Sequence, residues 1–246
     1  KQYELLMVKN DLDDVIDKSE LEKLPKSLRK YMNYVGVIGK KRISHFKVIY
    51  DGEMKLDRNK PWASVAGEQY TFMDTGTRLF YMKMNYKKLP IYGLHHFNKE
   101  DASMVIKILD IFKVVDESGE YLKKAETVTY FNDMCLFAPS TLLNADIVWK
   151  ELDDRRVEGT LTHDNVKVSA ILYFDDEGKL INFTSEDRYK SEKGGELQKC
   201  IWSTPVKEYD NYNGLNLISS GEAIWHDSEE DFSYIKLRIK DIIVNP

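Results

Sequence analysis

The five histidines are the first residues to consider for metal chemistry, and their spacing argues against it. None of them forms a metal-binding pair at helical spacing. His95 and His96 are neighbours on a predicted strand, so their side chains point to opposite faces and cannot easily share one metal ion. A zinc site needs three or four converging ligands. The sequence therefore predicts no metal site and no cofactor.

Candidate catalytic residues are equally scarce. The acidic clusters at 153–154, 175–177 and 229–231 fall in predicted turns, where turn chemistry accounts for them. The chain lacks the G-x-S-x-G, P-loop and dinucleotide-binding motifs, so we expect no catalytic residues. The alternative is an enzyme that uses His95 or His96 with Asp133 or Glu126. That hypothesis requires these groups to converge in a cleft with perturbed pKa values.

Asn132 and Asp133 are the polar residues in the most unusual setting. They interrupt an apolar run, between Phe131 and Met134. Buried polar groups of this kind must be hydrogen-bonded or functional. Two interpretations stay open: the pair bonds to nearby backbone or to Arg188, or it orients the head group of a ligand.

Methionine and aromatic residues gather in the first group of predicted strands. They are Met54, Met73, Met82, Met84 and Met104, together with Phe72, Phe80 and Tyr86. Methionine adapts to irregular contents and is frequent at promiscuous apolar sites. One interpretation is therefore an adaptable apolar cavity, and the other is an ordinary packed core.

Charge and composition narrow the class of partner. The 246 residues carry a formal net charge of −5, which argues against nucleic acid and against simple docking onto anionic lipid. No run approaches the roughly 18 to 20 apolar residues of a membrane span.

The chain begins at Lys1 rather than at Met, which we interpret as the loss of a signal or anchor. A disulfide between Cys135 and Cys200 stays open.

Hydrophobic spacing predicts the elements that must position these residues. Residues 1–18 form an approach segment, and residues 19–246 form a single β-rich domain that opens with an amphipathic helix ending at Gly36. The apolar spacing of residues 121–143 predicts a buried helix, which Pro139 ends. Runs with a period of two predict strands at 42–56, 62–73, 78–86, 91–97, 104–115, 146–152, 155–162, 166–174, 179–189, 199–209, 215–225 and 232–244.

Short motifs stand along the chain in a recognisable order. They are Leu-Pro-Lys-Ser-Leu-Arg-Lys-Tyr at 24–31, a helix at 129–143 that ends in Pro-Ser-Thr-Leu-Leu, the pair Arg188-Tyr189, and Trp202, Gly214 and Trp225. In this order the chain resembles a bacterial family of unknown function, from about residue 24 onward. Members often show a tryptophan where Cys135 or Leu136 stands, so this chain departs from the pattern there. The resemblance implies a shape and no activity.

A more distant resemblance concerns the order of elements. The chain is predicted to form strands, then an inserted helix, then more strands with a hairpin at 173–180. This order is similar to that of the unclosed barrel of lipoprotein carriers. Those proteins hold acyl chains between a curved sheet and helices. A likeness of fold carries little functional weight on its own.

The sequence thus predicts a mainly β fold: a strongly curved antiparallel sheet, or unclosed β-barrel, with an N-terminal helix and an inserted helix on its concave side. The functional hypothesis is a non-catalytic, extracytoplasmic module, in the periplasm or cell envelope, that binds a lipid or other apolar small molecule. It includes a membrane tether upstream of Lys1. A third hypothesis is an interaction or assembly module that uses a sheet edge or apolar patch. The expected ligand-binding residues are Phe80, Met82, Met84, Met104, Phe131, Asn132, Asp133, Arg188 and Tyr189.

Overall fold

The computed structural model describes residues 15–191, 197–227 and 230–246. The strands of its large sheet are β1 (His45–Met54), β2 (Ala63–Phe72), β3 (Thr77–Tyr86), β4 (Leu89–Phe97), β5 (Ala102–Ile108), β6 (Phe112–Ser118), β7 (Ile147–Asp153), β8 (Arg156–His163), β9 (Val166–Phe174), β10 (Leu180–Ser185), β13 (Ile201–Ser203), β14 (Val206–Tyr212), β15 (Leu215–His226) and β16 (Asp231–Val244). A separate small sheet pairs β11 (Tyr189–Ser191) with β12 (Leu197–Lys199).

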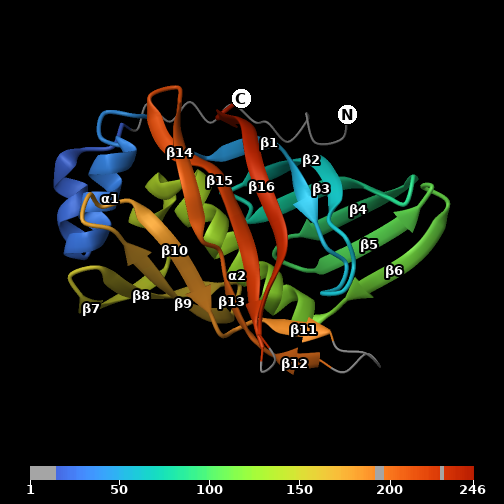
Figure 1. Cartoon of the computed structure of the whole chain (residues 1–246). Coiled ribbons are helices and arrows are strands. Elements are labelled where there is room, and N and C mark those ends of the chain that lie inside the picture. The colour runs from blue at the N-terminus through green and yellow to red at the C-terminus, as the bar shows by residue number, and fades with distance from the viewer. Residues whose placement is uncertain (1–14, 192–196, 228–229) are drawn as a thin grey trace.

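The large sheet is antiparallel and does not close into a barrel, as the sequence predicted (Figure 1). Its spatial order is β6-β5-β4-β3-β2-β1-β16-β15-β13-β10-β9-β8-β7, and β14 pairs with β15 beside this path. The two edge strands, β6 and β7, are consecutive strands in the chain. The segment between them must therefore travel from one edge of the sheet to the other.

Helix α2 (Glu120–Phe137) and the short 3-10 helix η3 (Pro139–Leu143) make that crossing. The helix contacts β5 and β6 in one half of the sheet and β9 in the other. Figure 1 shows α2 enclosed by the curved strands. The predicted helix at 121–143 is thus confirmed on the concave side, with a break near Pro139 where the ring removes a backbone donor.

Side chains on one face of α2 pack tightly against the β7 to β10 half of the sheet. Phe131 is fully buried, with its ring centroid 5.5 Å from that of Phe183 and 6.2 Å from that of Trp149. Gly159 on β8 permits this approach, because a Cβ at that position would lie 2.8 Å from the Phe131 ring. A bulky residue at 159 would therefore push the helix off the sheet.

Helix α1 (Lys26–Val35), preceded by the 3-10 helix η2 (Lys18–Lys23), closes one end of the molecule. Its buried residues include Leu28, Tyr31, Met32 and Val35, as the helical spacing predicted. The Tyr31 hydroxyl donates to the carbonyl of Cys135 at 2.7 Å, which ties α1 to the last turn of α2. Gly36 ends the helix at φ 83°, in the left-handed region that favours glycine.

Three predicted strands are in fact pairs of strands. The run 104–115 turns at Leu109 and Asp110, whose φ angles are 55° and 58°, and leucine gave no signal for a turn. The run 199–209 breaks before Pro205, which cannot donate to a sheet ladder. The run 179–189 breaks between β10 and β11. The twelve strands predicted from the sequence are therefore too few.

The cysteines, the helices and the predicted approach segment can each be compared with the sequence analysis within the described residues. Cys135 and Cys200 are both free and buried, so they form no disulfide. Among the described residues no helix has the length and apolar character needed to cross a membrane. Of the predicted approach segment, residues 1–14 lie outside the described residues, whereas Ile16 is buried in the core.

The packing of Phe131 yields a stability prediction. Phe131→Ala should lower the free energy of unfolding by about 3–5 kcal/mol, because it opens a cavity where α2 meets the sheet. Phe112→Ala is the matched control, since Phe112 is 62% exposed on an edge strand and should change stability by about 0.5 kcal/mol at most. Urea unfolding followed by circular dichroism measures both, and equal losses would contradict the packing described.

Candidate functional site

A cavity of about 200 Å³ lies between α2 and the inner face of strands β1 to β4, β13, β15 and β16. Most of its wall is apolar. The side chains of α2 that line it fall on one face of the helix, at positions 126, 129, 132, 133, 136 and 137. The opposite face packs on β7 to β10, so the cavity occupies one side of the helix only.

Tyr50 forms a flat part of the cavity wall. Its ring stacks on Phe80 with centroids 5.2 Å apart, and its hydroxyl donates to the carbonyl of Tyr81 at 2.8 Å. To reach that carbonyl on β3, the side chain crosses Gly67 of the intervening strand β2. A Cβ at Gly67 would lie 2.6 Å from the Tyr50 hydroxyl oxygen, so this wall requires glycine.

Arg78 organises the polar side of the cavity. Its Nε donates to Oδ2 of Asp133 at 2.6 Å, and its Nη1 donates to Oε2 of Glu126 at 3.0 Å. Its Nη2 donates to Oε1 of Gln69 at 3.0 Å, and Gln69 in turn donates to Asp133 at 2.7 Å. All four side chains are buried, so this is a desolvated, hydrogen-bonded cluster that joins β2 and β3 to α2.

The two carboxylates of this cluster respond differently to burial. Burial alone would raise the pKa of Glu126, but the hydrogen bond with His95 and the charge of Arg78 outweigh it and lower the pKa to about 2. Burial also raises the pKa of Asp133, and Arg78 and Gln69 offset only part of that rise. Arg78 thus bonds to both carboxylates, and His95 and Arg78 together keep Glu126 ionised.

His95 and Glu126 converge, as the enzyme hypothesis required. His95 Nδ1 lies 3.2 Å from Oε1 of Glu126, and the imidazole packs edge-on against Phe80. Asp133 joins them only through Arg78. His96 does not line the cavity, because it alternates with His95 along β4. The pair His95–Glu126 could move a proton, and that hypothesis remains a prediction.

Asn132 and Arg188 are also fixed by hydrogen bonds. The Asn132 amide donates to the hydroxyl of Thr204 at 2.8 Å, and Arg188 Nη1 donates to the hydroxyl of Thr129 at 2.6 Å. Asp133 does not contact Arg188, so the proposed partner for the polar pair was wrong for both members: Thr204 and Arg78 take that role.

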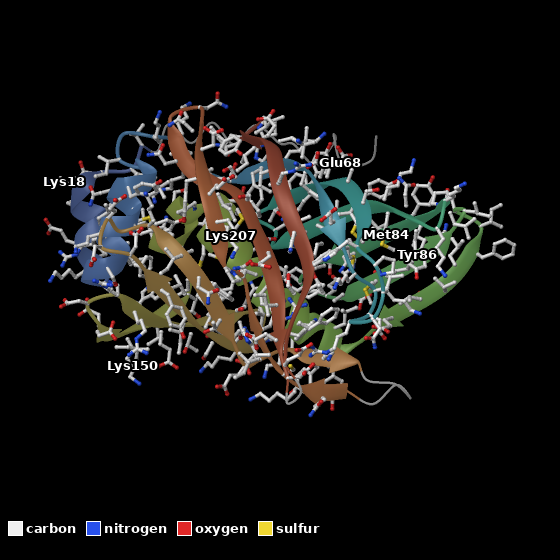
Figure 2. All side chains as sticks on the ribbon, viewed as in Figure 1. Lys18, Glu68, Met84, Tyr86, Lys150 and Lys207 are labelled. Carbon is white, nitrogen blue, oxygen red and sulfur yellow. The ribbon has the colours of Figure 1, made fainter. Side chains whose placement is uncertain are left out.

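The nine expected ligand-binding residues divide into two groups. Those that line the cavity are Phe80, Met82, Asn132, Asp133 and Arg188. Met84, labelled in Figure 2, is buried in a small core around β2 and β3. Met104 lies on the same sheet face as Phe80 and His95, one strand further out. Phe131 faces the opposite half of the sheet, and Tyr189 packs against Tyr121 outside the cavity lining.

Sequence reasoning missed Arg78, Gln69 and Trp202. A signal for Arg78 was present, because it shares the alternating face of Phe80, Met82 and Met84 on a predicted strand. An arginine on the buried face of a strand needs a carboxylate partner, which Asp133 could have supplied. Nothing in the spacing of Gln69 or Trp202 identified them.

A larger and more polar cleft, of about 650 Å³, lies where β1 begins and β8 turns into β9. His163 contributes to its lining and packs against Phe97 and Tyr130. Burial lowers the pKa of His163, which favours the neutral imidazole. The described residues contain no group of three potential metal ligands, here or elsewhere.

One further set of residues has the order of contacts found in serine hydrolases. Ser203 Oγ lies 2.7 Å from His226 Nε2, and His226 Nδ1 lies 2.7 Å from Asp231 Oδ1. Ser203 is only 1% exposed, however, and it lines neither cavity. A nucleophile needs access to a substrate, so we interpret these contacts as a link between β13, β15 and β16.

Comparisons with known proteins find one matching family and several solved structures with weak similarity. Residues 14–237 match the family of unknown function DUF6544, and no curated protein matches the chain. A putative outer membrane lipoprotein-sorting protein domain from Vibrio parahaemolyticus shares 9% identity over 82% of this chain and 85% of that one, with a TM-score of 0.44.

Two other solved structures are similar at the same level. A DUF1329 family protein from Desulfovibrio piger shares 10% identity over 93% of this chain and 94% of that one, with a TM-score of 0.46. A LolA superfamily protein from Nitrosomonas europaea shares 9% identity over 88% and 90%, with a TM-score of 0.43. At these values the likenesses concern the course of the chain and say nothing about a ligand.

The Arg78 cluster yields a prediction for pH dependence. Glu126 has a lowered pKa, so its contribution to stability is present at neutral pH and is lost as pH falls from 4.5 toward about 2. Arg78→Met should cost about 3–5 kcal/mol near neutral pH, because it leaves two buried carboxylates without a cation. Their pKa values then rise, so the loss should shrink as the pH is lowered through mildly acidic values.

Urea unfolding at several pH values measures this difference. Arg238→Met is the control, since the Arg238 side chain is 69% exposed beside Asp51 and should matter little at any pH. A loss in Arg78→Met that stays constant across the pH range would show that the carboxylates do not depend on Arg78.

Proposed function

This chain belongs to the family of unknown function DUF6544, and we propose from its geometry that it is a non-catalytic module that binds a lipid or other apolar ligand. The observation that supports this most is the incomplete filling of the space between α2 and the sheet. Phe80, Met54 and Leu237 face the cavity yet remain partly exposed, although α2 lies opposite them. Apolar side chains on the inner face of a sheet are normally buried.

The size of the cavity suits part of an apolar molecule. Ligand pockets usually measure about 300–1,000 Å³, and this one measures about 200 Å³. It would therefore enclose one end of an acyl chain or a small hydrophobic group. Each buried methylene contributes about 0.8 kcal/mol, so a few of them give appreciable affinity. Met54 and Met82 in the cavity wall can adjust to the shape of the ligand.

The inner face of the sheet offers a path for the rest of such a ligand. Met104 pairs with His95, and Ile106 pairs with Gly93, so both lie on the face that carries Phe80 and Met82. Both residues are partly exposed. A chain that leaves the cavity along β4 and β5 would cover this apolar strip.

The same proposal includes a place of action outside the cytoplasm, in the periplasm or cell envelope. The expected class of ligand supports this location, since lipids and other apolar molecules need carriers across the aqueous space of the envelope. Fractionation of cells that express the full-length protein tests it. Recovery in the cytoplasmic fraction alone would exclude it.

Binding can be tested with a neutral probe and a variant that fills the cavity. We expect N-phenylnaphthylamine, which fluoresces in apolar surroundings, to bind the protein and to be displaced by decanol. Ala223 lines the cavity on β15, so Ala223→Phe should weaken binding about tenfold or more. Ala66→Phe is the matched control, because Ala66 is exposed on β2.

Thermal unfolding of both variants confirms that they remain folded. If folded Ala223→Phe binds the probe as tightly as the wild type, the probe occupies another place. If the wild type binds neither the probe nor decanol, the proposed function fails.

An assembly role is the second candidate, and edge strand β6 favours it. Phe112 and Val114 on β6 are 62% and 53% exposed, and Ile111 just before it is 75% exposed. Among the described residues β6 pairs only with β5. Unpaired apolar edges promote association. If β6 mediates self-assembly, the sedimentation coefficient should rise with protein concentration, and Phe112→Lys should remove the rise. A constant coefficient would exclude self-association through this edge.

A further inference from the structure

Arg188 differs from every other charged group in the cavity lining, because within the described residues it has no ion-pair partner. Of the three carboxylates in the lining, Glu126 and Asp133 are bonded by Arg78, and Glu222 pairs with Lys207 at 2.8 Å. The carboxylate next to Arg188 in sequence, Asp187, accepts instead from Lys124 at 2.8 Å.

The guanidinium of Arg188 is held by contacts with aromatic rings, whereas buried arginines are usually held by a carboxylate. Its guanidinium lies 4.3 Å from the ring centroid of Trp202 and 5.5 Å from that of Trp225. A guanidinium stacked on an aromatic face keeps its N–H donors free in its own plane. Among the described residues the guanidinium of Arg188 makes one hydrogen bond, to Thr129, and its Nε is buried without a hydrogen-bond partner.

A guanidinium with five N–H groups is therefore positioned at the wall of an apolar cavity with most of its donors unused. Arg78 cannot play the same part, because its Nε, Nη1 and Nη2 all donate within the buried cluster. Glu126 is close enough to Arg188 for the arginine to contribute to its lowered pKa. Both Glu126 oxygens, however, are already engaged by Arg78 and His95.

We propose that Arg188 receives the anionic head of the ligand, so that the ligand is an amphiphile with a carboxylate or phosphate group beside its apolar chain. This inference rests on the proposed binding function and adds the chemical class of the ligand. Carboxylate and phosphate oxygens match the planar fork of a guanidinium, and such bonds strengthen where water is excluded. The chain then lies against Met82, Leu136 and Ala223, which line the same cavity.

The test compares ligands that share a ten-carbon chain and differ only in the head. Decanoate, decyl phosphate and decanol are titrated into the wild type at neutral pH, with displacement of N-phenylnaphthylamine as the readout. We expect at least one of the two anions to bind about tenfold or more tighter than decanol. Inorganic phosphate without a chain should not displace the probe.

Variants at Arg188 assign that difference to the residue. Arg188→Leu should bring the anions to the affinity of decanol and leave decanol within about twofold of its wild-type value, which also shows that the cavity is intact. Arg188→Lys keeps the charge without the planar fork and should retain part of the preference. Arg238→Leu, at an exposed arginine, should change nothing.

The outcomes separate the two proposals. Equal binding of decanol and both anions, or an equal loss of all three in Arg188→Leu, overturns the head-group inference and leaves the apolar site standing. Displacement by inorganic phosphate alone overturns the amphiphile and indicates a site for a free anion. Failure of every chain-bearing ligand to bind overturns the proposed function together with the inference.

Discussion

The crossing from β6 to β7 is the constraint on which the rest of this structure depends. These strands are consecutive in the chain but form opposite edges of the sheet. Any segment that joins them across the concave side loses contact with water along its path, so its backbone groups need partners. A helix supplies them internally, which explains why residues 120–137 are helical. The same helix fills the concave side of the sheet, between the two edge strands that would have to meet to close a barrel.

A helix enclosed in this way cannot carry ionised side chains without partners, and Arg78 meets that requirement for Glu126 and Asp133. Buried ion pairs are seldom the most stable solution, since well-packed apolar residues often do as well. Their geometry offers something that apolar packing does not. The two carboxylates lie seven positions apart on α2, about two helical turns, and both bond to one guanidinium. Turning the helix about its axis would break both bonds, so the cluster fixes which face of α2 meets the cavity.

The general fold could be predicted from the sequence because hydrophobic spacing reports burial directly. Toward its end the segment 121–143 is apolar on nearly all sides, which indicated a buried helix. The turn at Leu109 could not be predicted, because its positive φ is set by strand pairing rather than by the residue type. Asn132 and Asp133 were recognised as unusual, yet their partners Thr204 and Arg78 were not. Contacts between elements so distant in sequence depend on register, which spacing within one element does not contain.

The two faces of α2 explain why a protein with a well-packed core still has an empty region beside it. Phe131 and its neighbours on one face interlock with aromatic rings of β7 and β10, and this contact holds the helix in place. The other face presents Glu126, Thr129 and Asn132, which are hydrogen-bonded to Arg78 on β3, to Arg188 and to Thr204. Opposite them stand small residues such as Gly221 and Ala223, so the gap is not filled from the sheet side either. The apolar packing that holds the helix and the cavity therefore lie on different faces of α2, and on the cavity side the buried Arg78 cluster holds the helix where apolar packing is missing.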